Sequence, residues 1–87
     1  MIIVINRKRM FAMTLAQTGN GMKVRIINLE SMNQLVRRRF IDLGIVEGSV
    51  ISLIKALPFG GPLTIDAMGQ RIAIRKSEAE CITVEAA

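Results

Sequence analysis

The sequence has no histidine, tryptophan or tyrosine, and only three phenylalanines and one cysteine among its 87 residues. Without histidine, it lacks the side chain that most often acts as a general base or a metal ligand near neutral pH. The single cysteine, Cys81, excludes an internal disulfide, and its apolar surroundings favour a buried thiol over a nucleophile. So few aromatic side chains also disfavour base stacking and a groove for proline-rich peptides.

Acidic residues are scarce as well. The seven Asp and Glu residues are scattered and form no dense set of oxygen ligands. Glu78 and Glu80 fit the first turn of a short helix, where backbone dipoles favour acids. The chain also has no glycine-rich phosphate-binding motif and no pairing of a nucleophile with a base. We therefore predict a protein that is not an enzyme, holds no cofactor and has no metal site of its own.

Basic and hydrophobic residues, by contrast, are abundant. Twelve Lys and Arg leave a net charge of +5, which favours acidic partners, phosphate groups or an anionic membrane surface. Hydrophobic residues make up 51% of the chain, and a single small domain cannot hide all of them, so some are expected to meet a partner. No apolar run approaches the roughly 20 residues of a membrane-spanning helix. The absence of a secretory signal favours a cytoplasmic location.

Five stretches have the patterns of short strands. In the first, the charged residues Lys23 and Arg25 alternate with apolar neighbours, as in a strand with one buried face. The third and fourth stretches flank Met68-Gly69, which predicts a hairpin whose tight turn uses the glycine. Inward-pointing side chains are expected at Ile65, Ile72 and Ile74. The predicted strands are residues 22–29, 50–56, 63–67, 70–75 and 82–84.

The stretch from Ser31 to Gly48 contains the longest predicted helix. Ser31 and Gln34 have the spacing of a capping box, and Gly44 is a natural end because glycine adopts a positive φ easily. One stripe of this helix is apolar, and the opposite face is charged. The predicted buried stripe consists of Met32, Leu35, Val36, Phe40 and Leu43, and the predicted solvent-facing residues are Arg37, Arg38 and Asp42.

Two more capping patterns predict single helical turns, at residues 14–17 and 77–81. The domain is expected to span residues 13–85, followed by a tail at residues 86–87. Residues 1–12 are interpreted as an N-terminal extension, which fits a flexible tail, an added edge strand or a loose membrane contact. Five short strands, one helix after the first strand and short helical turns predict an all-β fold, most simply a small SH3-like barrel.

Several motifs occur in an order and spacing that point to a known family. They are Met13-Thr-Leu15, Arg39-Phe-Ile-Asp-Leu-Gly44, Glu47-Gly48-Ser49, Pro58-Phe-Gly-Gly-Pro62, Ile72-Ala-Ile-Arg75, and Ser77-Glu-Ala79 followed by Ile82-Thr-Val84. Together they resemble FeoA, the small cytosolic component of bacterial ferrous iron transport, from residue 13 to about residue 85. The resemblance implies an SH3-like barrel that works beside FeoB, a membrane transporter with a cytosolic GTP-binding domain. It implies an assembly factor or a regulator, not the pore.

Two groups of residues are candidates for partner binding. Arg37 and Arg38 fit either a solvated helix face or a docking site for an acidic surface of FeoB. Leu57 and Phe59 are bulky apolar groups in an exposed loop that contains Pro58 and Pro62, and they are a candidate anchor for a partner. The outward positions Val50, Ile54 and Ala56 of the preceding strand would extend this anchor into one patch, unless residues 1–12 or a second copy cover them.

Two other functions compete with contact to FeoB. A basic SH3-like barrel is compatible with nucleic-acid binding, although the chain offers little aromatic surface for stacking. The same domain type resembles the C-terminal module of iron- and manganese-dependent repressors, which suggests a metal-responsive regulatory module. No helix-turn-helix or dimerising domain accompanies it in this sequence, which favours the free-standing form.

Overall fold

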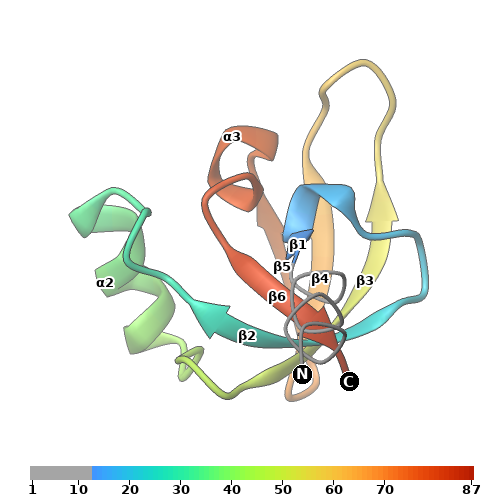
Figure 1. Ribbon diagram of the computed structural model, residues 1–87. Coiled ribbons are helices and arrows are strands. Elements are labelled where there is room, and N and C mark those ends of the chain that lie inside the picture. The colour runs from blue at the N-terminus through green and yellow to red at the C-terminus, as the bar shows by residue number, and fades with distance from the viewer. Residues whose placement is uncertain (1–12) are drawn as a thin grey trace, which may run out of the picture.

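The computed structural model describes residues 13–87. Six antiparallel strands form one curled sheet in the order β1-β6-β2-β3-β4-β5, with the helical segments at its margins (Figure 1). The elements are β1 (Met13–Thr14), the 3-10 turn η1 (Leu15–Gln17), β2 (Lys23–Asn28), α2 (Gln34–Asp42), β3 (Val50–Ala56), β4 (Leu63–Ala67), β5 (Gln70–Ile74), α3 (Lys76–Ala79) and β6 (Thr83–Ala86). The mostly β, SH3-like architecture that the sequence predicts is confirmed.

Both ends of the described chain join the sheet. The strand β1 is absent from the five predicted strands, because its two residues, paired with Val84 and Thr83, are too few to show a period of two. At the other end, β6 continues to Ala86, which pairs with Val24, and the N–H of Ala87 donates to the carbonyl of Lys23 at 3.1 Å. The residues expected as a C-terminal tail therefore extend the sheet. The predicted extension at residues 1–12 lies outside the described residues.

Alternation along the strands places one face of each in a single core. On β2, Val24 and Ile26 are buried, while Lys23, Arg25 and Ile27, which alternate with them, are exposed. On β3, Ile51 and Leu53 are likewise buried. The predicted inward positions are confirmed for Ile65 and Ile74, whereas Ile72 is only partly buried. The buried core consists of Leu15, Val24, Ile26, Leu29, Met32, Phe40, Ile45, Ile51, Leu53, Leu63, Ile65, Ala67, Ile74, Ala79, Ile82 and Val84.

The helix starts differ in part from the capping patterns in the sequence. At η1 the predicted pair holds, because the N–H of Thr14 donates to Gln17 Oε1 at 2.8 Å. The predicted cap at Ser31 is wrong: Asn33 precedes α2, and its Oδ1 accepts the N–H of Leu35 at 2.8 Å. Asparagine is as strong an N-cap as serine, so spacing alone could not choose between them.

A similar shift occurs at α3. The predicted pair of Ser77 with Glu80 is wrong, because the N-cap is Arg75, two residues earlier, and Glu80 is the C-cap. Its first-turn acid Glu78 accepts the N–H of Arg75 at 2.9 Å. Cys81, expected as a buried thiol, is only partly buried, and its Sγ–H donates to the carbonyl of Ser77 at 3.4 Å.

The end of α2 is as predicted. Gly44 has φ +82°, its N–H donates to the carbonyl of Ile41 at 2.9 Å, and the N–H of Ile45 donates to the carbonyl of Phe40 at 2.8 Å. These two bonds form a Schellman motif, and both Ile45 and Phe40 are fully buried. The stop signal at Gly44 is therefore reinforced by a core contact.

The predicted apolar stripe of α2 is only partly buried. Phe40 is the one fully buried residue of the helix, and Val36 packs partly against the core. Leu35 is 79% exposed, so its prediction as a core residue is wrong. At 100° per residue, Leu35 lies about 140° around the helix from Phe40. Because α2 packs against the domain only through the narrow face that contains Phe40, Leu35 remains exposed to solvent.

The end of α2 lies close to the hairpin of β4 and β5, and β5 is one of the two edge strands of the sheet. Gln70 Nε2 donates to the carbonyl of Leu43 at 3.5 Å, and the side chain of Met68 lies against Gly44. Farther along, Arg39 of α2 and Ala73 of β5 line one hollow. The end of α2 and the residues that follow it therefore lie close to the β4–β5 hairpin, whereas a hollow separates the middle of the helix from β5.

Candidate partner-binding surface

The structure places the two predicted partner-binding groups on different parts of the molecule. Arg37 and Arg38 are exposed on α2, and Leu57 and Phe59 lie in the long loop between β3 and β4 (Figure 1). Figure 1 shows the helix on one side of the sheet and the loop projecting from the opposite upper corner. These residues therefore form two surfaces instead of one.

The predicted apolar patch along β3 is not continuous. Val50 starts the strand, about 23 Å of extended chain before Leu57. Val50 is 38% exposed, and Ile54, at a register shift between Leu53 and Lys55, is partly buried. Of the predicted outward positions, Ala56 is exposed directly before Leu57.

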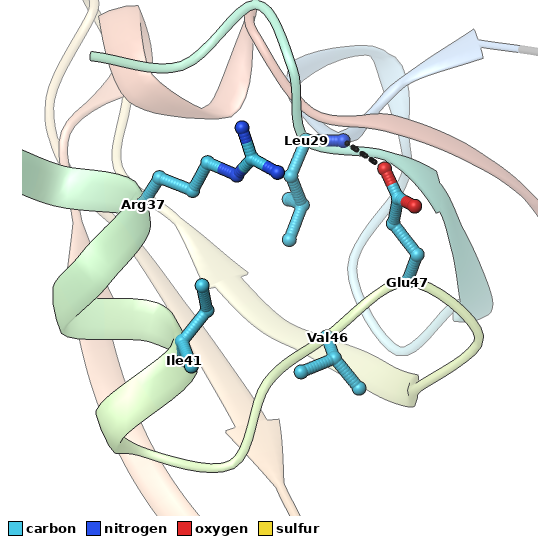
Figure 2. Close-up of a pocket in the computed structure, with 5 residues that line it drawn as sticks. All are labelled: Leu29, Arg37, Ile41, Val46 and Glu47. Carbon is cyan, nitrogen blue, oxygen red and sulfur yellow. Dashed lines mark hydrogen bonds between the residues drawn. The ribbon is translucent and has the colours of Figure 1, made fainter. Parts of the chain in front are cut away.

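A hollow of about 300 Å³ lies between α2 and the chain that follows it (Figure 2). Leu29, just after β2, is nearly fully buried. Arg37 and Ile41 line the hollow from successive turns of α2, and Figure 2 shows Arg37 reaching toward Leu29. Val46 and Glu47 line it from the connection to β3. The hollow thus combines apolar side chains with one basic and one acidic group.

The acidic group of this hollow also holds the local backbone. Glu47 Oε2 accepts the N–H of Leu29 at 3.2 Å, as the dashed line in Figure 2 shows. The turn around Glu47 is closed by the N–H of Val46, which donates to Ser49 Oγ at 3.0 Å, and by the N–H of Gly48, which donates to the carbonyl of Ile26 at 2.7 Å. These hydrogen bonds fix the side of the hollow at residues 46–49 to β2 and to the residue that follows it.

Two exposed apolar residues that line this hollow, Ile41 and Val46, were not among the predicted site residues, and Leu35 is exposed on α2 instead of buried. Leu35 is 79% exposed, Ile41 is 49% exposed and Val46 is 46% exposed. Around the helix, Arg38 lies between Leu35 and Ile41, about 60° from each. The weak signal in the sequence was an apolar residue, Ile41, outside the predicted stripe. We call Leu35, Arg37, Arg38, Ile41 and Val46 the α2 surface.

The α2 surface has the composition of a contact site for a protein. Exposed apolar side chains next to arginines are typical of interfaces, where arginine is enriched. The third arginine of the run, Arg39, points elsewhere, with its Nη2 4.0 Å from Glu78 Oε1. Within residues 13–87, no group of three or more metal-ligating side chains is placed to hold an ion. No helix of this same part of the chain is long and apolar enough to cross a membrane.

Comparison with known proteins identifies the family. The family model of the FeoA domain matches residues 13–86, which is nearly all of the described chain. The chain belongs to the FeoA family. No curated protein matches it.

Solved structures agree with this membership. A FeoA protein from Chlorobium tepidum is 31% identical, with a TM-score of 0.79 over 85% of this chain and 70% of that one. Iron(II) transport protein A from Clostridium thermocellum is also 31% identical, with a TM-score of 0.75 over 85% of this chain and 45% of that one. The resemblance to FeoA from residue 13 to about residue 85 is therefore confirmed.

Transcriptional repressors are also among the solved structures that resemble this FeoA domain. A manganese-dependent transcriptional repressor has a TM-score of 0.78 at 17% identity, over 87% of this chain and 42% of that one. At this identity the likeness concerns the fold alone. It shows that the same small barrel also occurs as one part of a longer protein.

Proposed function

We propose that this FeoA domain is a cytoplasmic, non-catalytic accessory protein of ferrous iron transport that binds the cytosolic region of the FeoB transporter through the α2 surface. Membership of the FeoA family supports the link to iron transport. The observation that carries the proposed contact is the exposure of Leu35 and Ile41 on either side of Arg38. A solvated helix would have no need of large apolar groups at these positions.

The arrangement suits a partner segment that carries both apolar and acidic side chains. An apolar side chain of FeoB would enter the hollow beside Ile41 and Val46, and acidic groups would pair with Arg37 and Arg38. Arginine pairs with carboxylates through two parallel hydrogen bonds, which adds orientation to affinity. In this proposal the charges set the approach and the register, and the apolar contacts supply most of the binding energy.

The direct test is a titration of isotopically labelled protein with the soluble cytosolic region of FeoB, with and without bound nucleotide, followed by amide chemical shifts. Shifts centred on Leu35, Arg38, Ile41 and Val46 support the proposal. An absence of shifts at any concentration, with both proteins folded, contradicts it.

Matched variants make the test specific. Ile41→Ser removes an exposed apolar group from the α2 surface, and Val50→Ser removes a similarly exposed one from the start of β3. Ile41→Ser is expected to weaken binding, whereas Val50→Ser is expected to leave it within about twofold. Equal loss in both variants would indicate a diffuse contact and would contradict the assignment to α2.

A further inference from the structure

The loop between β3 and β4, residues 57–62, is the second exposed apolar feature of the described chain. The side chain of Phe59 is completely exposed, with a relative accessibility of 103%, and Leu57 is 44% exposed. Figure 1 shows this loop projecting beyond the rest of the sheet, at the end of the molecule opposite the C-terminus. We call residues 57–62 the projecting loop. Its apolar groups stand on a convex tip, unlike those beside the hollow at α2.

The projecting loop has a defined shape. The N–H of Leu57 donates to the carbonyl of Pro62 at 3.1 Å, and the N–H of Gly61 donates to the carbonyl of Pro58 at 3.2 Å. Phe59 has φ +59°, a conformation that bulky residues rarely adopt. Such a conformation persists only where the surrounding chain imposes it, and it is often associated with function. The loop therefore holds a large apolar ring outward at a backbone position that suits glycine better.

Basic side chains surround the base of this loop. Lys55 lies two residues before Leu57 and is exposed. Arg75 and Lys76, at the start of α3, line a hollow of about 460 Å³ together with Gly60 and Pro62 of the loop. The three cations thus come from two segments that the fold brings to the same end of the sheet.

Acidic groups do not offset these charges at the tip. Residues 55–62 include no Asp or Glu, and none lines the hollow between the loop and α3. Glu78, two residues after Lys76, lines a neighbouring hollow with Pro62 and Arg75, but its side chain is only 16% exposed, lies 4.0 Å from Arg39 and accepts the N–H of Arg75. The exposed charges next to the projecting loop are therefore predominantly positive.

We propose that the projecting loop docks on an anionic lipid bilayer, with Phe59 and Leu57 entering the interface and Lys55, Arg75 and Lys76 meeting the phosphates of the headgroups. Membrane affinity of a peripheral protein comes from buried apolar area together with attraction of basic residues to anionic lipids. Insertion of a protruding apolar side chain into a bilayer interface requires no preformed pocket, because the lipids rearrange around it. This inference goes beyond the contact with FeoB and does not depend on it.

The chain has no tryptophan, so a single introduced one reports its own surroundings. The first experiment uses the full chain with Phe59→Trp and, as a matched control, Met68→Trp. Met68 is 68% exposed in the turn between β4 and β5 and also has a positive φ. Vesicles of phosphatidylcholine mixed with phosphatidylglycerol are expected to shift the emission of Phe59→Trp to shorter wavelength and to allow quenching by brominated lipid. The emission of Met68→Trp is expected to stay unchanged.

The second experiment measures sedimentation with the same vesicles for charge variants of the full chain. Lys55→Gln and Lys76→Gln are each expected to weaken binding about fivefold, and about 25-fold together. Lys23→Gln, an exposed lysine on β2, serves as the control. Because all variants share the rest of the chain, binding by any other segment contributes equally to each.

Three results would overturn the proposal. The first is equal emission of the two tryptophan variants with vesicles, and the second is equal sedimentation of the lysine variants and the control. The third is a blue shift of Phe59→Trp with the cytosolic region of FeoB but not with vesicles, which would assign the loop to a protein contact. Chemical shifts confined to the α2 surface in the FeoB titration would leave the membrane proposal intact, so the two proposals fail separately.

Discussion

The α2 surface and the projecting loop both expose apolar side chains beside basic ones, yet they differ in shape and in charge. The α2 surface borders a hollow, and Glu47 stands in that hollow opposite Arg37. Phe59 on the projecting loop is instead completely exposed, and the hollow between this loop and α3 is lined by Arg75 and Lys76 and by no acidic side chain. Exposed apolar residues on a small domain therefore do not define one interface, since shape and charge together select the partner.

The largest expected effect concerns how α2 is attached. Phe40→Ala removes the only fully buried side chain of α2, and it should lower the free energy of unfolding by about 3–5 kcal/mol. Phe59→Ala, which removes the same side chain from the projecting loop, should change it by less than about 0.5 kcal/mol. Denaturant unfolding followed by circular dichroism measures both. Similar losses in the two variants would show that the loop packs as the helix does.

The second prediction concerns the positive φ that occurs both at Gly44, after α2, and at Phe59 in the projecting loop. Gly44→Ala should lower the free energy of unfolding by about 1–2 kcal/mol, because φ is +82° there. An added Cβ would also lie 3.1 Å from the side chain of Met68. Thermal unfolding measures the change. Gly19→Ala is the control, because no heavy atom lies within 4 Å of its added Cβ and its φ is not in the left-handed range. Equal stability of the two variants would contradict the prediction.

The third prediction separates the two surfaces by charge. Arg37→Glu combined with Arg38→Glu should weaken binding to the cytosolic region of FeoB about tenfold at low salt. Lys55→Gln combined with Lys76→Gln should leave that binding within about twofold. Calorimetric titration at two salt concentrations measures these affinities. A stronger effect of the lysine pair than of the arginine pair would reverse the assignment of the surfaces.

The smallest expected effect is a gain in stability. Phe59→Gly should raise the free energy of unfolding by about 0.5 kcal/mol, because glycine accepts the positive φ of this position while the unfolded chain gains some freedom. The same variant should bind anionic vesicles more weakly. Denaturant unfolding and sedimentation, made on one preparation, test both statements. A loss of stability would indicate that the ring of Phe59 makes contacts within the domain.

Local chemistry explains which structural predictions succeeded. The stop at Gly44 and the hairpin turn at Met68-Gly69, where φ is +53° and +83°, depend on residues next to one another in the chain. The predicted start of α2 was wrong because the sequence offers two good N-cap residues, Ser31 and Asn33, two positions apart. In the structure, Ser31 lies within a turn closed by the N–H of Met32, which donates to the carbonyl of Leu29 at 3.1 Å, so the helix begins after Asn33.

The sequence by itself determined the order of the elements other than β1, the inward positions Ile65 and Ile74, and the membership of the FeoA family. These properties follow from alternation, turn residues and motifs that act over a few neighbouring positions. Only the tertiary structure decided that Leu35 is exposed, that Ile41 and Val46 border one hollow, and that Lys76 lies beside the projecting loop. Such proximities depend on how α2 and α3 pack against the sheet. The apolar periodicity of a helix predicts which side is buried, but it does not predict how much of that side the rest of the domain covers.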